Sequence, residues 1–84
     1  MPSRDEIHAA LSGHLQEMFG VAADKIVPSA RLYEDLELDS IDAIDLVVKL
    51  QEYTGRKIAP GEFKSVRTVS DVVDRLHHHI AARP

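Results

Sequence analysis

Apolar residues recur every three or four positions in three stretches of the chain, the spacing that places them on one face of an α-helix. The three stretches span residues 3–19, 40–53 and 69–80. A shorter segment, residues 60–65, predicts a minor helix with Phe63 as its one large apolar anchor. No stretch alternates apolar and polar residues as a strand does. The pattern therefore predicts an all-α, four-helix bundle of three main helices and one short helix.

Candidate capping residues support these boundaries. Ser3 with Glu6, and Thr68 with Asp71, have the spacing of capping pairs at the starts of the first and last main helices. Gly20 follows the first helix, where a left-handed C-terminal residue is expected.

Residues 20–38 follow neither a helical nor a strand period and form a long connection between the first two main helices. A connection of this length inside a small domain is often functional. It leads directly to Asp39, a natural N-cap residue, and to Ser40 at the start of the second main helix.

The second main helix has more apolar residues than one buried stripe needs. Ile44 and Val48 follow the helical spacing. With Ile41 they are candidates for apolar positions on an acidic docking face, but for Ile44 and Val48 we favour the interpretation as core residues. Leu46 and Leu50 widen the apolar surface further. We therefore expect this helix to contact both the core and a second surface.

Composition narrows the class of protein. Of the 84 residues, 44% are hydrophobic and 29% are charged, which is typical of a globular domain, and the length predicts one domain over residues 1–84. The absence of cysteine excludes a disulfide scaffold, a zinc ribbon and a thiol nucleophile. No apolar run reaches the roughly 20 residues that span a bilayer, and the N-terminus lacks the pattern of a signal peptide. We therefore expect a cytoplasmic domain that is too small for a full catalytic pocket.

The formal net charge of −4 is unevenly distributed along the chain. Six acidic residues and no basic residue lie between positions 34 and 45, so this segment carries −6 and the remainder carries +2. Because such a segment repels phosphate groups, it argues against nucleic acid and favours a basic protein partner. The six residues are Glu34, Asp35, Glu37, Asp39, Asp42 and Asp45.

Within this acidic segment, one hydroxyl group lies between two aspartates at the start of the second main helix. Residues 32–50, LYEDLELDSIDAIDLVVKL, resemble the acyl carrier protein family. In that family an Asp-Ser-Leu or Asp-Ser-Ile motif marks the serine that receives a 4′-phosphopantetheine arm, and the matching residues are Asp39, Ser40 and Ile41. The similarity covers essentially the whole chain and includes Glu34-Asp35-Leu36, Asp45-Leu46-Val47 and Thr68-Val69.

The resemblance implies a stand-alone (type II) acyl carrier protein that is not an enzyme and is a monomer when free. Its 4′-phosphopantetheine arm would come from coenzyme A, be attached covalently to Ser40, and hold acyl intermediates as thioesters. Since the chain has no cysteine, the thiol of such a thioester must belong to an added group. The implied partners are a phosphopantetheinyl transferase and ketosynthase, acyltransferase, ketoreductase and dehydratase-type enzymes with basic docking patches.

The resemblance also implies a docking surface and an interior cavity for the acyl chain. Each set of residues has a plainer interpretation as well, because exposed carboxylates usually form a solvated helix face and buried aliphatic residues usually form ordinary core. The docking candidates are Glu34, Asp35, Glu37, Ile41, Asp42, Asp45 and Glu52. The cavity candidates are Leu46, Val47, Leu50, Phe63, Val69 and Val72.

Ser40 likewise has both a plain structural interpretation and a functional one. A serine near the first turn of a helix is common and often serves only the helix terminus. A phosphodiester on Ser40, however, would lie near the free N–H groups and the positive dipole end of the second main helix, which favour an anion.

Other functions fit the residues less well. Asp35, Glu37 and Asp39 alternate like the start of a calcium-binding loop. That loop needs glycine at its sixth position and glutamate at its twelfth, where this chain has Ser40 and Leu46. A serine hydrolase needs Gly-x-Ser-x-Gly, which is also absent. The remaining alternative is an unmodified helical interaction module that docks through its acidic second helix.

Three adjacent histidines, residues 77–79, do not predict a metal site. Neighbouring positions on a helix point about 100° apart, so three of them cannot share one face. We expect them to form a polar helix end, and we expect no metal in this protein.

Three positions depart from the common fatty-acid pattern of the family. Glu37 stands where the loop often has glycine, Leu32 where phenylalanine is common, and Ile41 where leucine is commonest. None of these changes removes the serine. Together with residues 62–69, EFKSVRTV, they suggest a carrier of a secondary pathway, such as a polyketide or aryl-polyene system, in place of primary fatty-acid synthesis.

Overall fold

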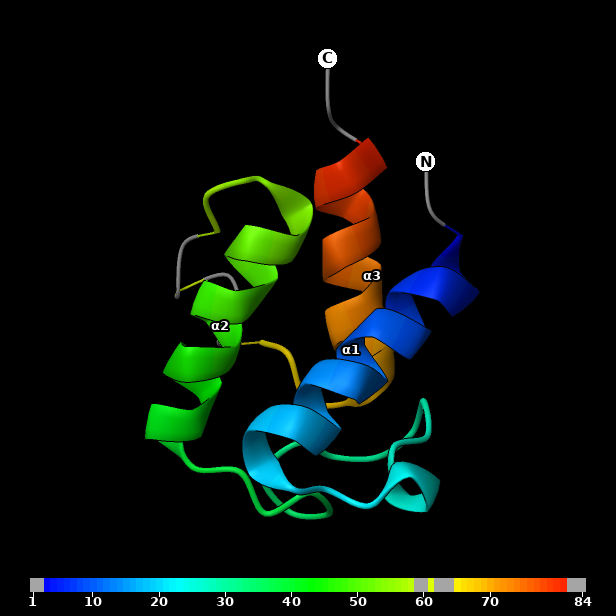
Figure 1. Cartoon of the computed structure of the whole chain (residues 1–84), viewed down its shortest axis with the longest axis vertical. Coiled ribbons are helices and arrows are strands. Elements are labelled where there is room, and N and C mark those ends of the chain that lie inside the picture. Colours follow the sequence, from blue (N-terminus) through cyan, green and yellow to red (C-terminus); the bar gives the residue numbers. More distant parts are fainter. Residues whose placement is uncertain (1–2, 59–60, 62–64, 82–84) are drawn as a thin grey trace.

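The described residues of the computed structural model are 3–58, 61 and 65–81. They contain three α-helices, α1 (Arg4–Phe19), α2 (Ser40–Thr54) and α3 (Val69–Ala81), and a short 3-10 helix, η1 (Ala23–Lys25), in the first connection (Figure 1). The prediction of an all-α fold is confirmed. η1 was not predicted, and most of the predicted minor helix at 60–65, Phe63 included, lies outside the described residues.

The predicted capping residues set the helix boundaries. The Ser3 hydroxyl accepts a hydrogen bond from the Glu6 N–H at 3.2 Å, and the Thr68 hydroxyl accepts one from the Asp71 N–H at 3.2 Å. The Asp71 carboxylate accepts in turn from the Thr68 N–H at 3.1 Å, which completes a capping box at α3. α1 and α2 both end at a left-handed glycine, a conformation that strains other residues. These glycines are Gly20 (φ 67°) and Gly55 (φ 68°).

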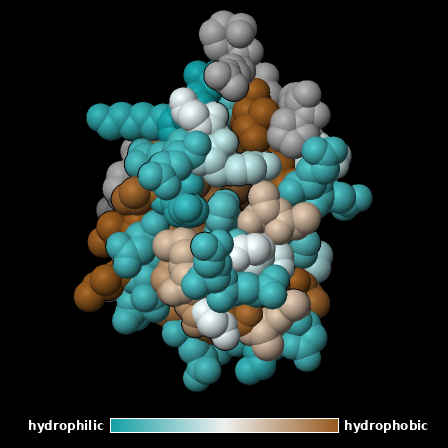
Figure 2. All heavy atoms as spheres, in the orientation of Figure 1, coloured by the Kyte–Doolittle hydropathy of each residue, from teal (hydrophilic) through white to brown (hydrophobic). Residues whose placement is uncertain are grey.

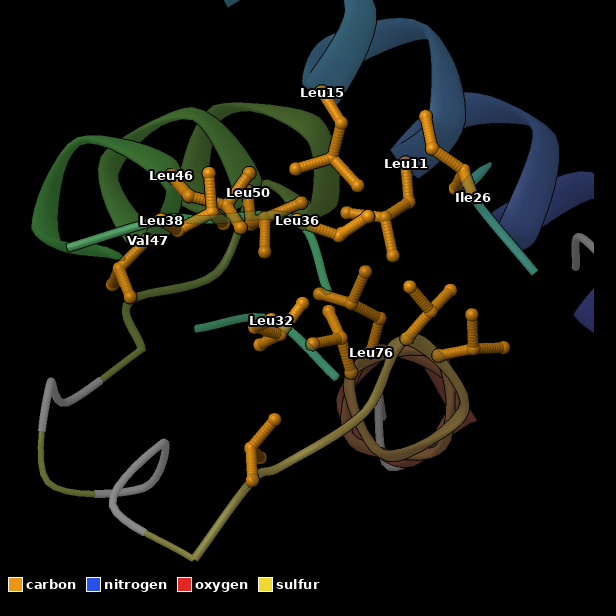
Figure 3. Packing of buried hydrophobic residues seen from close by; sticks show 14 of the residues in the cluster. Leu11, Leu15, Ile26, Leu32, Leu36, Leu38, Leu46, Val47, Leu50 and Leu76 are labelled. Atoms are coloured by element: carbon orange, nitrogen blue, oxygen red, sulfur yellow. The ribbon is translucent and has the colours of Figure 1, made fainter. Parts of the chain in front are cut away.

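The three helices surround one hydrophobic core. Leu11 and Leu15 of α1, Leu50 of α2 and Leu76 of α3 are fully buried and point toward one another (Figure 3). α2 stands beside α3, and α1 crosses in front of α3 and also contacts α2 (Figure 1). This arrangement leaves the N-terminal end of α2 next to the long first connection.

Leucines of the first connection complete the core. Leu32, Leu36 and Leu38 are buried among the helices, although they follow no regular spacing (Figure 3). Backbone hydrogen bonds also attach this segment to α3: the Leu32 N–H donates to Arg67 O and the Val69 N–H donates to Ala30 O, both at 2.9 Å. The connection is therefore an integral part of the fold that holds the start of α2 in place.

The core face of α2 differs from the prediction. Ile44 and Val48, for which core was the favoured interpretation, have 56% and 52% of their surface exposed, whereas Leu46 and Leu50, predicted to line the interior, are buried. Aliphatic residues occupy both sides of this helix, so spacing alone did not decide which side the leucines of α1 and of the first connection would cover. In Figure 2 hydrophobic groups project at the edge that α2 forms in Figure 1. Ile41, Ile44 and Val48 are therefore exposed and available for the second contact expected of α2, which stays a prediction.

A histidine lies between α1 and α2. The His14 ring contacts the Tyr53 ring edge-on, with centroids 5.9 Å apart. Its Nε2 is buried and has no hydrogen-bond partner among the described residues. Burial, helped by the positive charge of Lys49, lowers the pKa of His14, while Glu17 and Glu52 oppose this shift. The neutral imidazole is therefore favoured in the folded protein.

We expect His14 to make folding sensitive to mild acid. Because its folded pKa is below the ordinary value of 6.5, the unfolded chain binds the proton more readily. The stabilising contribution is complete above about pH 6.5 and is lost as the pH falls through the lower folded pKa. His14→Gln should flatten the fall in urea midpoint between about pH 7.5 and about pH 5.5. An unchanged slope in this variant would contradict the assignment.

One finding bears on membrane location. Among the helices of the described residues, none combines the length and the hydropathy that crossing a bilayer requires.

Candidate functional site

Ser40 is the first residue of α2, at the lower end of the helix in Figure 1, where the first connection meets it. Its side chain is exposed, and its hydroxyl forms no hydrogen bond with the part of the chain that the structure describes. A hydroxyl in this position is open to an incoming enzyme and is not needed to cap the helix.

Asp39 and Asp42 do the capping. The Asp39 carboxylate accepts from the Asp42 N–H at 2.8 Å, and the Asp42 carboxylate accepts from the Asp39 N–H at 3.2 Å. This reciprocal pair is a capping box in which Asp39 is the N-cap residue. It holds the backbone on both sides of Ser40 in one geometry.

The capping box leaves two backbone donors beside the hydroxyl. The first N–H groups of a helix have no carbonyl partner within the helix, and Asp39 satisfies only that of Asp42. The Ser40 and Ile41 N–H groups therefore remain available at the positive end of the α2 dipole. At α3 the corresponding N–H groups of Val69 and Ser70 already donate to carbonyls of the first connection. A phosphodiester on Ser40 thus fits the start of α2.

The backbone just before the site is strained. Glu37 has φ 57°, and no other described residue apart from glycine has a positive φ. A left-handed conformation costs a residue with a side chain about 1–2 kcal/mol. This is the position where the family pattern often has glycine. The strained turn directs Leu38 into the core and leads the chain to Asp39.

We expect Glu37→Gly to stabilise the protein. Glycine removes the left-handed strain but adds entropy to the unfolded chain, so the net gain in the free energy of unfolding should be about 0.5–1 kcal/mol. Glu37→Ala removes the same charge and keeps the strain, so it should give no such gain. Urea unfolding measures both variants. Equal gains in the two variants would mean that charge, and not backbone strain, is responsible.

The acidic docking candidates fall into two groups. In the first connection, Glu34 and Asp35 both contact the guanidinium of Arg31, at 2.5 and 3.1 Å. These hydrogen bonds hold the pKa of the Asp35 carboxyl below its ordinary value. Sequence reasoning missed Arg31 because it lies just outside the acidic segment and its contacts depend on how the connection turns.

The second group lies along α2. Asp45 is exposed and forms no ion pair with the described residues, and Glu52 is 3.9 Å from Lys49. Exposed Ile41, Ile44 and Val48 share this helix face, with 68%, 56% and 52% of their surface accessible. The face therefore combines carboxylates with aliphatic groups, which suits a surface that binds partners.

A small apolar cavity of about 20 Å³ lies beside α2. Leu46, Val47 and Val72, three of the six cavity candidates, line it. Leu50 and Val69 are buried in the core but do not line it, and Phe63 lies outside the described residues. The remaining lining residues, which sequence reasoning missed, are Leu32, Tyr33, Leu38, Ala43 and Val66. Ala43 lies one helical turn before the cavity candidate Val47, so helical spacing could have identified it. The other four lie outside the main helices, so no periodicity could have placed them beside the cavity.

Comparison with known proteins gives the family. The family profile described as "Phosphopantetheine attachment site" matches residues 9–76, which include the whole of the site. The chain belongs to the acyl carrier protein family. "Acyl carrier protein 2" of Ralstonia nicotianae is 51% identical over 77 residues, covering 92% of this chain and 95% of the relative. An acyl carrier protein of Thermosynechococcus vestitus is 32% identical, covering 95% and 99%.

The fold comparison agrees. An acyl carrier protein structure from Enterococcus faecalis superimposes with a TM-score of 0.74, covers 98% of this chain and 100% of its own, and is 22% identical.

Acyl carrier proteins are carriers, not enzymes, and their cofactor is a covalently attached 4′-phosphopantetheine. This carrier therefore interacts with a phosphopantetheinyl transferase and with biosynthetic enzymes that use its cargo.

Proposed function

We propose that residues 1–84 act as one carrier domain that holds acyl intermediates as thioesters on an arm attached to Ser40. The observation that carries this proposal is the exposed hydroxyl of Ser40, which forms no hydrogen bond with the described residues and lies at the first position of α2, directly after the N-cap Asp39. Ser40 is also the serine of the Asp-Ser-Ile motif by which the chain resembles its family.

The chain's own residues prepare the attachment point. The capping box of Asp39 and Asp42 fixes the backbone around Ser40 without using its hydroxyl. The free N–H groups of Ser40 and Ile41 favour the phosphodiester negative charge once it is formed. The attached group supplies the thiol that the chain itself lacks.

We further propose that partner enzymes bind the face of α2 through basic patches. Several exposed carboxylates together steer a basic partner and exchange rapidly, since single exposed pairs are weak. This suits a carrier that visits several enzymes in turn. The exposed Ile41, Ile44 and Val48 give such partners apolar contacts between the carboxylates. Of the predicted docking carboxylates on α2, Asp45 is the best placed, because it serves neither a cap nor an ion pair among the described residues, unlike Asp42 and Glu52.

The partner enzymes we propose are those of fatty-acid or polyketide-type synthesis in the cytoplasm, including ketosynthase, acyltransferase, ketoreductase and dehydratase-type enzymes. The departures from the fatty-acid pattern at Leu32, Glu37 and Ile41 favour a secondary pathway, such as polyketide or aryl-polyene synthesis. We also propose the apolar cavity lined by Leu46, Val47 and Val72 as the inner end of an acyl site. At about 20 Å³ it holds no more than a methyl-sized group, so a longer chain requires the helices to separate.

Isolation of the carrier from its own cells tests this function. The protein should carry a thioester that hydroxylamine releases, and the mass of the released acyl group identifies the class of pathway. A holo form that never carries a hydroxylamine-labile group, even when its biosynthetic genes are expressed, would contradict the carrier role.

We expect Asp45→Lys to weaken the recognition of the carrier by a phosphopantetheinyl transferase. The reversed charge repels a basic patch, so the KM for the carrier should rise about three- to tenfold at low salt with little change in kcat. The effect should shrink as salt is added. Reversal of Asp42 is a poorer test, because its carboxylate accepts the Asp39 N–H and its loss would loosen the start of α2.

Asp24→Lys is the matched control. Asp24 is exposed on η1, outside both α2 and the acidic segment, and its reversal changes the net charge equally. Equal KM values for the two variants would show that net charge, and not the α2 face, governs recognition.

A further inference from the structure

A cation of the chain itself binds the carboxylates of the first connection. Arg31 Nη1 donates to Glu34 Oε2 at 2.5 Å, and Arg31 Nε and Nη2 donate to the two carboxylate oxygens of Asp35, each at 3.1 Å. The Arg31 backbone N–H adds a fourth bond, to Asp35 Oδ2 at 2.8 Å. The contact with Asp35 is the bidentate fork of a guanidinium on a carboxylate, which is the strongest geometry for such a pair.

The carboxylates nearest to Ser40 in the sequence, on both sides of it, have no such cation among the described residues. Asp39 and Asp42 accept backbone N–H groups of the capping box. Within the described ranges, neither Glu37 nor Asp45 forms an ion pair. Carboxylates without an ion pair among the described residues therefore begin at Glu37 and continue into α2, whereas Arg31 offsets one of the two negative charges of Glu34 and Asp35.

We propose that Arg31 determines partner specificity by withholding Glu34 and Asp35 from the basic side chains of partner proteins. A basic partner then binds through Glu37, Asp42 and Asp45. This inference rests on the proposed docking of basic enzymes at this end of the carrier. The inference predicts which partners bind well. A partner whose cations extend over the first connection is disfavoured, and a partner that places a carboxylate near Arg31 is favoured.

The geometry allows Arg31 to act in this way. Its side chain is 55% exposed, so an approaching protein meets the guanidinium directly. The turn does not depend on the side chain, because the Asp35 and Leu36 N–H groups donate to the Arg31 carbonyl at 2.9 and 3.1 Å. Buried Leu32 anchors the same turn in the core. Arg31 can therefore be replaced without removing the contacts that hold the connection.

Hexalysine peptide is the probe, used with the unmodified full chain in roughly 0.02 M salt. In wild-type protein, amide shifts on titration should appear at Asp42 and Asp45 and be absent at Glu34 and Asp35. In Arg31→Gln they should also appear at Glu34 and Asp35, and the affinity should rise about two- to fivefold. Shifts at Glu34 and Asp35 in the wild-type protein, equal to those at Asp45, would overturn the proposal.

Three further variants separate masking from net charge. Lys57→Gln removes one positive charge beyond the opposite end of α2 and should change the affinity much less than Arg31→Gln. Arg31→Lys keeps the charge but loses the bidentate fork on Asp35, so the affinity should rise, though by less than in Arg31→Gln. Adding Glu34→Gln and Asp35→Asn to Arg31→Gln should abolish the gain. Equal gains in Lys57→Gln and Arg31→Gln, or a gain that persists in the triple variant, would overturn the proposal.

The experiment is independent of the attachment chemistry. The peptide binds unmodified protein, so failure of Ser40 to accept phosphopantetheine would leave these results unaffected. If the peptide shifts no residue of the acidic segment in any variant, the docking proposal itself fails together with the role of Arg31. Circular dichroism of each variant confirms that the helices are retained.

Discussion

Ser40→Ala should abolish attachment of phosphopantetheine completely. The substitution removes the one oxygen to which the arm can be joined at the start of α2, and no neighbouring group replaces it: Asp39 and Asp42 have carboxylates engaged in the cap, and the chain has no cysteine. Intact mass after incubation with coenzyme A and a promiscuous phosphopantetheinyl transferase should show no gain.

The fold should survive this change. The Ser40 hydroxyl forms no hydrogen bond with the described residues, and alanine is accepted in a first helical turn, so the free energy of unfolding should change by less than about 0.5 kcal/mol. Ser29→Ala is the matched control, since Ser29 is also exposed but lies in the first connection. It should be loaded as the wild-type protein is. Full loading of Ser40→Ala would place the arm on another residue.

Leu50→Ala should cost about 2–5 kcal/mol of the free energy of unfolding. Leu50 is fully buried where α1, α2 and the first connection meet, and its truncation leaves a cavity that these elements cannot fill without moving. A domain of this size has about 4–13 kcal/mol in total, so the loss is a large share of it. Urea unfolding with linear extrapolation measures the difference.

Val48→Ala is the control on the same helix. Val48 is 52% exposed and should lose less than about 0.5 kcal/mol. Comparison of the two variants therefore shows which side of α2 faces the core. If Val48→Ala costs as much as Leu50→Ala, the original interpretation of Val48 as a core residue would be restored and the α2 face described above would be wrong.

Local chemistry made much of the fold predictable. The capping side chains of Ser3, Asp39 and Thr68 each accept a hydrogen bond from the backbone N–H three residues later. Because these contacts are local, the starts of the three helices could be predicted from the sequence to within one residue. The same is true of Ser40, whose place at the start of α2 follows from its N-cap neighbour. The proposal that Ser40 is the attachment residue came from the resemblance, since a serine in a first helical turn is common.

Features that depend on long-range packing were not predictable. α2 carries aliphatic residues on both sides, so Ile44 and Val48 were assigned to the core until the packing of α1 and the first connection showed otherwise. The connection has no period, so the burial of Leu32 and Leu38 could not be foreseen. The contact of Arg31 with the acidic segment depends on that same turn.

The central claim is that Ser40 carries the arm, and one measurement tests it directly. The wild-type chain is incubated with coenzyme A and a phosphopantetheinyl transferase, weighed intact, and then fragmented to locate the added mass. We predict a gain of one phosphopantetheine, confined to the peptide that contains Ser40. No gain would support an unmodified interaction module that docks through α2, and a gain on any other residue would contradict the assignment of the site.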